Sequence, residues 1–92
     1  YLKPLEEVDK HLTAHRTFLK NLYDKGVTIC SGPQILRTGG FILMNAKIKT
    51  EALGIMKKDP YIIHEVAEYS FIEFELKSFA EGFEKLIKNS EQ

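Results

Sequence analysis

The sequence is poor in several features that mark whole classes of protein. Its only cysteine is Cys30, which excludes an internal disulfide and makes a reducing cytoplasm the simplest compartment. The 13 basic and 13 acidic side chains cancel, which disfavours nucleic acid and anionic membrane surfaces as partners, because both select a basic excess. No apolar run approaches the roughly 20 residues that span a bilayer, and no signal-peptide pattern is present. These absences predict a cytoplasmic protein with no nucleic-acid or membrane partner.

The length of the chain limits its hydrophobic core. The 92 residues are enough for one domain, 1–92, and no repeat, low-complexity tract or linker divides them. A domain of this size buries only about 60–65 % of its unfolded surface. Because such a core is modest, association with a second copy would add useful buried area.

The stretch from Pro4 to Gly26 predicts one long amphipathic helix with a histidine in its apolar stripe. Pro4 suits a first turn, and Lys25-Gly26 suits a helix end. The stripe recurs at alternating spacings of three and four residues and consists of Leu5, Val8, Leu12, His15, Leu19 and Leu22. A side chain that titrates near neutral pH needs a polar partner or a function in such a stripe. His15 is therefore the first candidate site residue.

The rest of the chain alternates short strands and helices. The pattern predicts strands at Val27–Cys30, Phe41–Ile48 and Ala67–Leu76, and helices at Glu51–Lys58, Tyr61–Val66 and Ser78–Lys88. In the last strand, Tyr69 and Phe71 point to one face, while Ser70, Ile72 and Phe74 point to the other. This order predicts an α+β fold with a ferredoxin-like split βαβ sheet, a first strand expected before Tyr1, and an extra C-terminal helix.

Both faces of the Phe41–Ile48 strand are apolar, although such a sheet carries its helices on one face only. The uncovered face needs a lid, and a second copy of the same sheet would supply one. We therefore expect a homodimer that packs through the sheet face. The alternative is a monomer in which the C-terminal helix covers that face.

Four motifs resemble, in their order and spacing, the YciI-like (YCII-related) proteins. They are His15-Arg16-Thr17-Phe18-Leu19, Ser31-Gly32-Pro33, Gly39-Gly40-Phe41 and Asp59-Pro60-Tyr61. The resemblance covers a core of residues 1–76 and leaves the C-terminal helix, 78–88, outside. It implies a ferredoxin-like dimeric α+β barrel in which the helix histidine and the Asp-Pro aspartate share a pocket. Carried over by motif, these residues are His15 and Asp59.

The residue types allow two interpretations of His15 and Asp59. A carboxylate beside His15 would orient the ring, fix its tautomer and favour its protonated form, whereas burial alone disfavours that form. Such a pair can act as a general acid and base near neutral pH without a cofactor. Alternatively, His15 is a core histidine and Asp59 merely caps the helix that starts at Pro60.

Further candidates for ligand binding are Ser31, Arg37, Phe18 and Tyr61. Ser31 stands at the Gly-Pro turn, Arg37 lies on a loop where it can meet an anionic substrate, and the two aromatic rings can wall an apolar pocket. Each also has an ordinary explanation: satisfying a turn, a solvated loop arginine, or core packing.

Three other side chains are weaker candidates for chemistry. His11 and His15 are four residues apart, as zinc ligands on a helix often are, but the sequence shows no third ligand, so no metal is predicted. His64 is expected at the surface or facing a partner. Cys30 is expected to be a small buried apolar side chain.

Two functions remain open at this level. The first is a small cofactor-free enzyme that performs lyase or isomerase chemistry on a cyclic or aromatic metabolite, with His15 as acid and base and Asp59 as its orienting partner. The second is a non-catalytic dimeric module that binds a small ligand in the same pocket. A domain that serves assembly alone would have no pocket.

Overall fold

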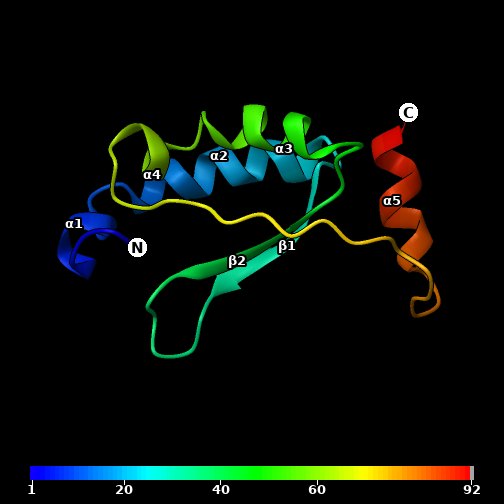
Figure 1. Ribbon diagram of the computed structural model, residues 1–92, viewed down its shortest axis with the longest axis horizontal. Coiled ribbons are helices and arrows are strands. Elements are labelled where there is room, and N and C mark those ends of the chain that lie inside the picture. Colours follow the sequence, from blue (N-terminus) through cyan, green and yellow to red (C-terminus); the bar gives the residue numbers. More distant parts are fainter. Residues whose placement is uncertain (92) are drawn as a thin grey trace.

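The computed structural model describes residues 1–91 of the chain, with side chains described through residue 87. It contains five helices and two strands within this range: α1 (Leu5–Asp9), α2 (Leu12–Asp24), β1 (Thr28–Pro33), β2 (Gly40–Met44), α3 (Lys49–Met56), α4 (Pro60–Ile63) and α5 (Phe83–Glu91). The helices α2, α3 and α4 lie along one side of the β1–β2 hairpin, and α5 stands apart at the far end of the molecule (Figure 1). The mixture of helices with an antiparallel hairpin agrees with an α+β fold.

The predicted long helix is two helices, so that expectation was wrong. A turn at Lys10 and His11 separates α1 from α2, and His11 has a non-helical backbone with φ −111° and ψ 7°. Val8 in α1 packs with Tyr61 and Val66, whereas the second half of the stripe packs on Met56. The turn thus allows one apolar stripe to reach two separate clusters.

The end of α2 agrees with the sequence. Gly26 adopts the left-handed conformation, with φ 75°. Its N–H donates to the carbonyl of Tyr23 at 3.0 Å, and the N–H of Val27 donates to the carbonyl of Leu22 at 2.9 Å. This pair of bonds is a Schellman motif, which satisfies two free carbonyls and turns the chain into β1.

The hairpin is longer at its turn and shorter at its base than predicted. Ser31-Gly32-Pro33 belongs to β1 rather than to a break, and Gly32 pairs with Phe41 in the antiparallel register. Pro33 is tolerated because it is the last residue of a strand, where a missing N–H costs little. Cys30 is exposed, contrary to expectation, because the helices cover only one face of this two-stranded sheet.

The boundaries of the later helices also shift. β2 ends at Met44 rather than Ile48, and Ile48 instead precedes α3 as its N-cap residue. The last helix begins at Phe83 rather than Ser78 because Gly82, with φ 93°, lies outside helical geometry. The side-chain amide of Asn45 donates to the carbonyl of Ile87 at 3.1 Å and so joins α5 to the end of the hairpin.

No strand forms over Ala67–Leu76, where the sequence predicts the last one. Within the part of the chain that the structure describes, the backbone of residues 68–79 bonds to no other backbone group, and a strand requires such a partner. The predicted alternation nevertheless holds. Tyr69 and Phe71 pack on the cluster of Leu19, Leu22 and Met56, while Ile72 and Phe74 are 90 % and 65 % exposed.

Candidate functional site

Asp59 is a fully buried carboxylate at the start of α4. It is the N-cap residue of this helix, and its Oδ1 accepts the backbone N–H of Tyr61 at 3.0 Å. Pro60 occupies the first helical position, where its lack of an N–H is harmless. The interpretation of Asp59 as a helix cap is therefore correct.

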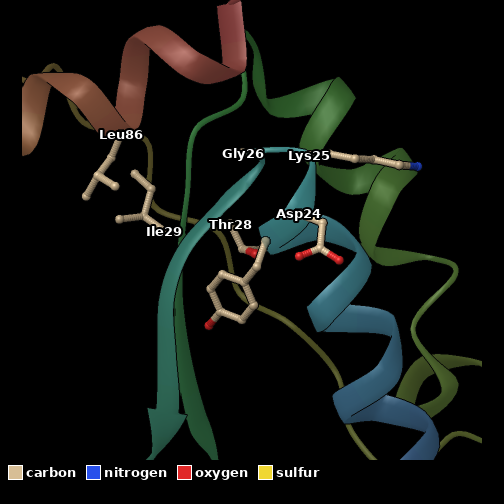
Figure 2. Close-up of a pocket in the computed structure, with 7 residues that line it drawn as sticks. Asp24, Lys25, Gly26, Thr28, Ile29 and Leu86 are labelled. Atoms are coloured by element: carbon tan, nitrogen blue, oxygen red, sulfur yellow. The ribbon is translucent and has the colours of Figure 1, made fainter.

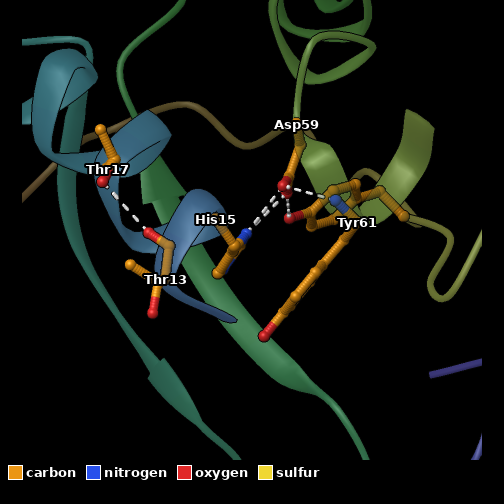
Figure 3. A network of polar contacts seen from close by, with 6 residues as sticks. Thr13, His15, Thr17, Asp59 and Tyr61 are labelled. Carbon is orange, nitrogen blue, oxygen red and sulfur yellow. Dashed lines mark hydrogen bonds and ion pairs between the residues drawn. The ribbon is translucent and has the colours of Figure 1, made fainter. Parts of the chain in front are cut away.

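His15 projects from α2 towards the same carboxylate. Its Nδ1 lies 2.8 Å from Oδ1 and 2.9 Å from Oδ2 of Asp59 (Figure 3). The imidazole is 14 % exposed and the carboxylate 0 %. The two interpretations of Asp59 that the sequence left open are therefore compatible, because the carboxylate caps α4 and also contacts His15.

The contact fixes the tautomer of the neutral imidazole. An ionised carboxylate only accepts hydrogen bonds, so the proton of the neutral ring lies on Nδ1 and the lone pair lies on Nε2. Nε2 has no hydrogen-bond partner among the residues that the structure describes. The ring of Tyr61 stacks on His15, with centroids 3.8 Å apart and planes 4° from parallel, and so restricts its orientation.

Tyr69 completes the polar shell of Asp59. Its hydroxyl donates a short hydrogen bond to Oδ2. Burial raises the pKa of this hydroxyl, and the carboxylate of Asp59 raises it further. The sequence pattern places Tyr69 on one face of the expected last strand and does not indicate this bond. The residue type could have indicated this bond, because the hydroxyl of a tyrosine on an inward face needs a hydrogen-bond partner.

His15 lies on the wall of a groove of about 1180 Å³ that runs between the helices, β2 and the segment 67–74. This volume exceeds the roughly 300–1,000 Å³ of ordinary small-ligand sites, so a small molecule would fill only part of the groove. Among the predicted ligand-binding residues, those that line the groove are Ser31, Arg37 and Tyr61. Phe18 does not line it and packs against the Leu19 cluster instead.

The sequence model of the YCII-related domain matches residues 1–75. The protein belongs to the YCII-related family. This match confirms the resemblance drawn from the four motifs, and it includes His15, Asp59 and Tyr69 but not α5. Comparisons with curated proteins and with solved structures find no match. None of the helices in the described range is both long and apolar enough to cross a bilayer.

Two of the groove residues in this YCII-related protein already have partners. The guanidinium of Arg37 forms an ion pair with Asp9 of α1 and lies 6.0 Å above the ring of Tyr1. This guanidinium lowers the pKa of the Asp9 carboxyl. The hydroxyl of Ser31 shares a short hydrogen bond with Tyr23. A ligand would meet Arg37 as one half of an ion pair rather than as an isolated cation.

The remaining histidines pair with each other. His11 and His64 stack with centroids 4.0 Å apart and planes 11° from parallel, a contact that joins the start of α2 to the end of α4. Among the side chains that the structure describes, no cluster of three or more His, Cys, Asp or Glu residues has the arrangement to hold a metal ion.

A smaller pocket of about 260 Å³ lies where α2 meets β1 (Figure 2). Leu86 of α5 and Ile29 of β1 approach each other on one side of it, and Lys25 points away. Asp24 is its only acidic group and is paired with Lys20. Without a base beside an acid, this pocket is a weaker candidate for chemistry than the groove.

Proposed function

We propose that the protein is a small cofactor-free enzyme in which His15 acts as general acid and base and Asp59 orients it. The observation that carries the proposal is the contact of Nδ1 with both carboxylate oxygens, at 2.8 and 2.9 Å, on the wall of the groove. With its proton on Nδ1, the neutral form of this imidazole has a lone pair on Nε2 that can take a proton. A positioned acid–base group of this kind is worth about 10²–10⁴-fold in rate.

The groove narrows the class of substrate. Its lining includes the apolar side chains and aromatic ring of Leu12, Leu19, Ile42, Met56 and Tyr61, together with the cations of Arg16 and Arg37. Such a lining favours a small cyclic or aromatic metabolite. Removal of a proton next to a carbonyl, followed by its return or by loss of a leaving group, needs only acid–base groups. We therefore propose isomerase or lyase chemistry.

The test is exchange of carbon-bound protons with D₂O, followed by NMR in a panel of small lactones and hydroxylated aromatic compounds. The wild-type protein should catalyse exchange in at least one of them. His15→Asn keeps a planar polar side chain but removes the base, and we expect it to lose about 10²-fold or more of the rate while still binding the compound. Retained exchange in His15→Asn would show that the imidazole is not the base.

The second candidate function is a non-catalytic module that binds a small ligand. It is favoured by the cap that Asp59 provides to α4, because that role alone accounts for a buried carboxylate at this position. Binding without exchange, unchanged in His15→Asn, would select this function. Loss of neither binding nor exchange in the variant would leave His15 with a structural role only.

We also propose that the working form is a homodimer of the ferredoxin-like barrel type. Three large apolar side chains support it: Phe41, Ile72 and Phe74 are at least 63 % exposed. Phe41 alternates with Ile42 on β2, and Ile72 and Phe74 alternate with Tyr69 and Phe71. Ile42, Tyr69 and Phe71 pack towards the helices, whereas Phe41, Ile72 and Phe74 remain in solvent along the groove that His15 also lines.

A further inference from the structure

Tyr69 connects an irregular segment of the chain to the His15–Asp59 pair. The segment 68–79 forms no backbone–backbone hydrogen bond within the described range. Its one side-chain hydrogen bond to the helices, among the described residues, is that of the Tyr69 hydroxyl to Asp59. The aromatic ring packs on the Leu19 cluster at the same place. The hydroxyl is therefore fixed both by its ring and by its bond.

We propose that Tyr69 is a positioning residue for His15: its hydroxyl shares the Asp59 carboxylate with the imidazole and thereby sets the pH at which His15 changes from acid to base. This inference rests on the proposed function of the pair. Asp59 accepts from three donors, namely Nδ1 of His15, the N–H of Tyr61 and the hydroxyl of Tyr69. Each donor stabilises part of the negative charge, so each reduces what remains to stabilise a protonated imidazole.

The hydroxyl is suited to this role because it stays a donor. Burial and the neighbouring carboxylate both raise the pKa of Tyr69, so the hydroxyl keeps its proton far above neutral pH. His15 shares the groove with further titratable groups, among them Tyr1 and Glu68. Tyr61 stacks on His15 from α4, Arg16 and Arg37 line the same groove, and His11 stacks on His64 instead.

The experiment follows the imidazole of His15 by ¹H–¹⁵N NMR through a pH titration in the full chain. Tyr69→Phe keeps the ring and removes only the hydroxyl. We expect the titration midpoint of His15 to rise by about half a pH unit or more, because the carboxylate then concentrates its charge on the imidazolium. Tyr23→Phe is the matched control: it removes a hydroxyl that bonds to Ser31 rather than to Asp59, and it should leave the midpoint unchanged.

A second variant protects the test against a folding defect. Site-specific 3-fluorotyrosine at position 69 makes the hydroxyl a stronger donor, so the midpoint of His15 should fall instead of rise. An unchanged midpoint in folded Tyr69→Phe, or the same shift in Tyr23→Phe, would overturn the inference.

Asp59→Asn separates this inference from the proposed function. If Asp59→Asn lowers the midpoint of His15 while Tyr69→Phe has no effect, the pair stands and the role of Tyr69 falls. If neither variant moves the midpoint, the proposed pair itself falls.

Discussion

Asp59 both caps α4 and contacts His15, and the two roles do not exclude each other. A carboxylate has room for about four hydrogen bonds, so capping α4 through Oδ1 does not compete with holding His15. Helical periodicity placed His15 on an inward face, and that holds. Periodicity does not reveal which side chain an inward residue meets, because the two partners are 44 positions apart in sequence. The family motifs supplied that pairing.

The environment of Tyr69 beside Asp59 predicts that the stability of the folded protein is sensitive to alkaline pH. Burial and Asp59 hold the pKa of Tyr69 above its ordinary value of 10.0 in the folded protein. Above about pH 10 the unfolded chain has lost this proton while the folded protein keeps it, so the free energy of unfolding falls as pH rises. The slope from one such group is at most about 1.4 kcal/mol per pH unit.

Urea unfolding between pH 8 and pH 11 measures this slope. Tyr69→Phe should show a shallower loss of stability above pH 10 than the wild-type protein, whereas Tyr23→Phe should follow the wild-type curve. Parallel curves for wild type and Tyr69→Phe would contradict the assigned environment of this hydroxyl.

At the scale of elements, the sequence predicted correctly those features that depend only on residues close together in the chain. The cap at Gly26 is dictated by one left-handed residue, and the sequence identified it. The turn at His11 was missed because it depends on two clusters that exist only in the folded protein. The irregular course of Ala67–Leu76 was missed for a similar reason, since strand propensity does not supply a hydrogen-bonding neighbour.

Gly26 provides a prediction at this scale. An L-residue with φ near 75° is strained, so Gly26→Ala should lower the free energy of unfolding by about 1–2 kcal/mol. Gly54, inside α3, is the matched control. A methyl group there meets no atom within 4 Å, and Gly54→Ala should raise stability by up to about 1 kcal/mol. Chemical denaturation measures both, and equal effects of the two substitutions would refute the role of the cap.

At the scale of the whole molecule, the hairpin exposes apolar surface that a small monomer rarely leaves open. The helices cover only one side of β1 and β2 (Figure 1). The side chains of Phe41, Ile72 and Phe74 are 63 %, 90 % and 65 % exposed. Helix α5, which the sequence offered as an alternative lid, stands at the end of the hairpin and leaves this set uncovered. A second copy placed against this face would bury it on both chains at once.

A dimer through this face has a direct consequence for association. Light scattering should give twice the 10.6 kDa mass of the chain at micromolar concentration. Ile72→Lys combined with Phe74→Lys should reduce the mass to one chain, because four lysines would face each other across a two-fold interface without partners. The control is Ile35→Lys. Ile35 is 95 % exposed at the tip of the hairpin loop, so this substitution also places a lysine at an exposed apolar position but does not change the proposed interface. A monomeric wild-type protein, or a dimer that survives the double substitution but not Ile35→Lys, would place the interface elsewhere.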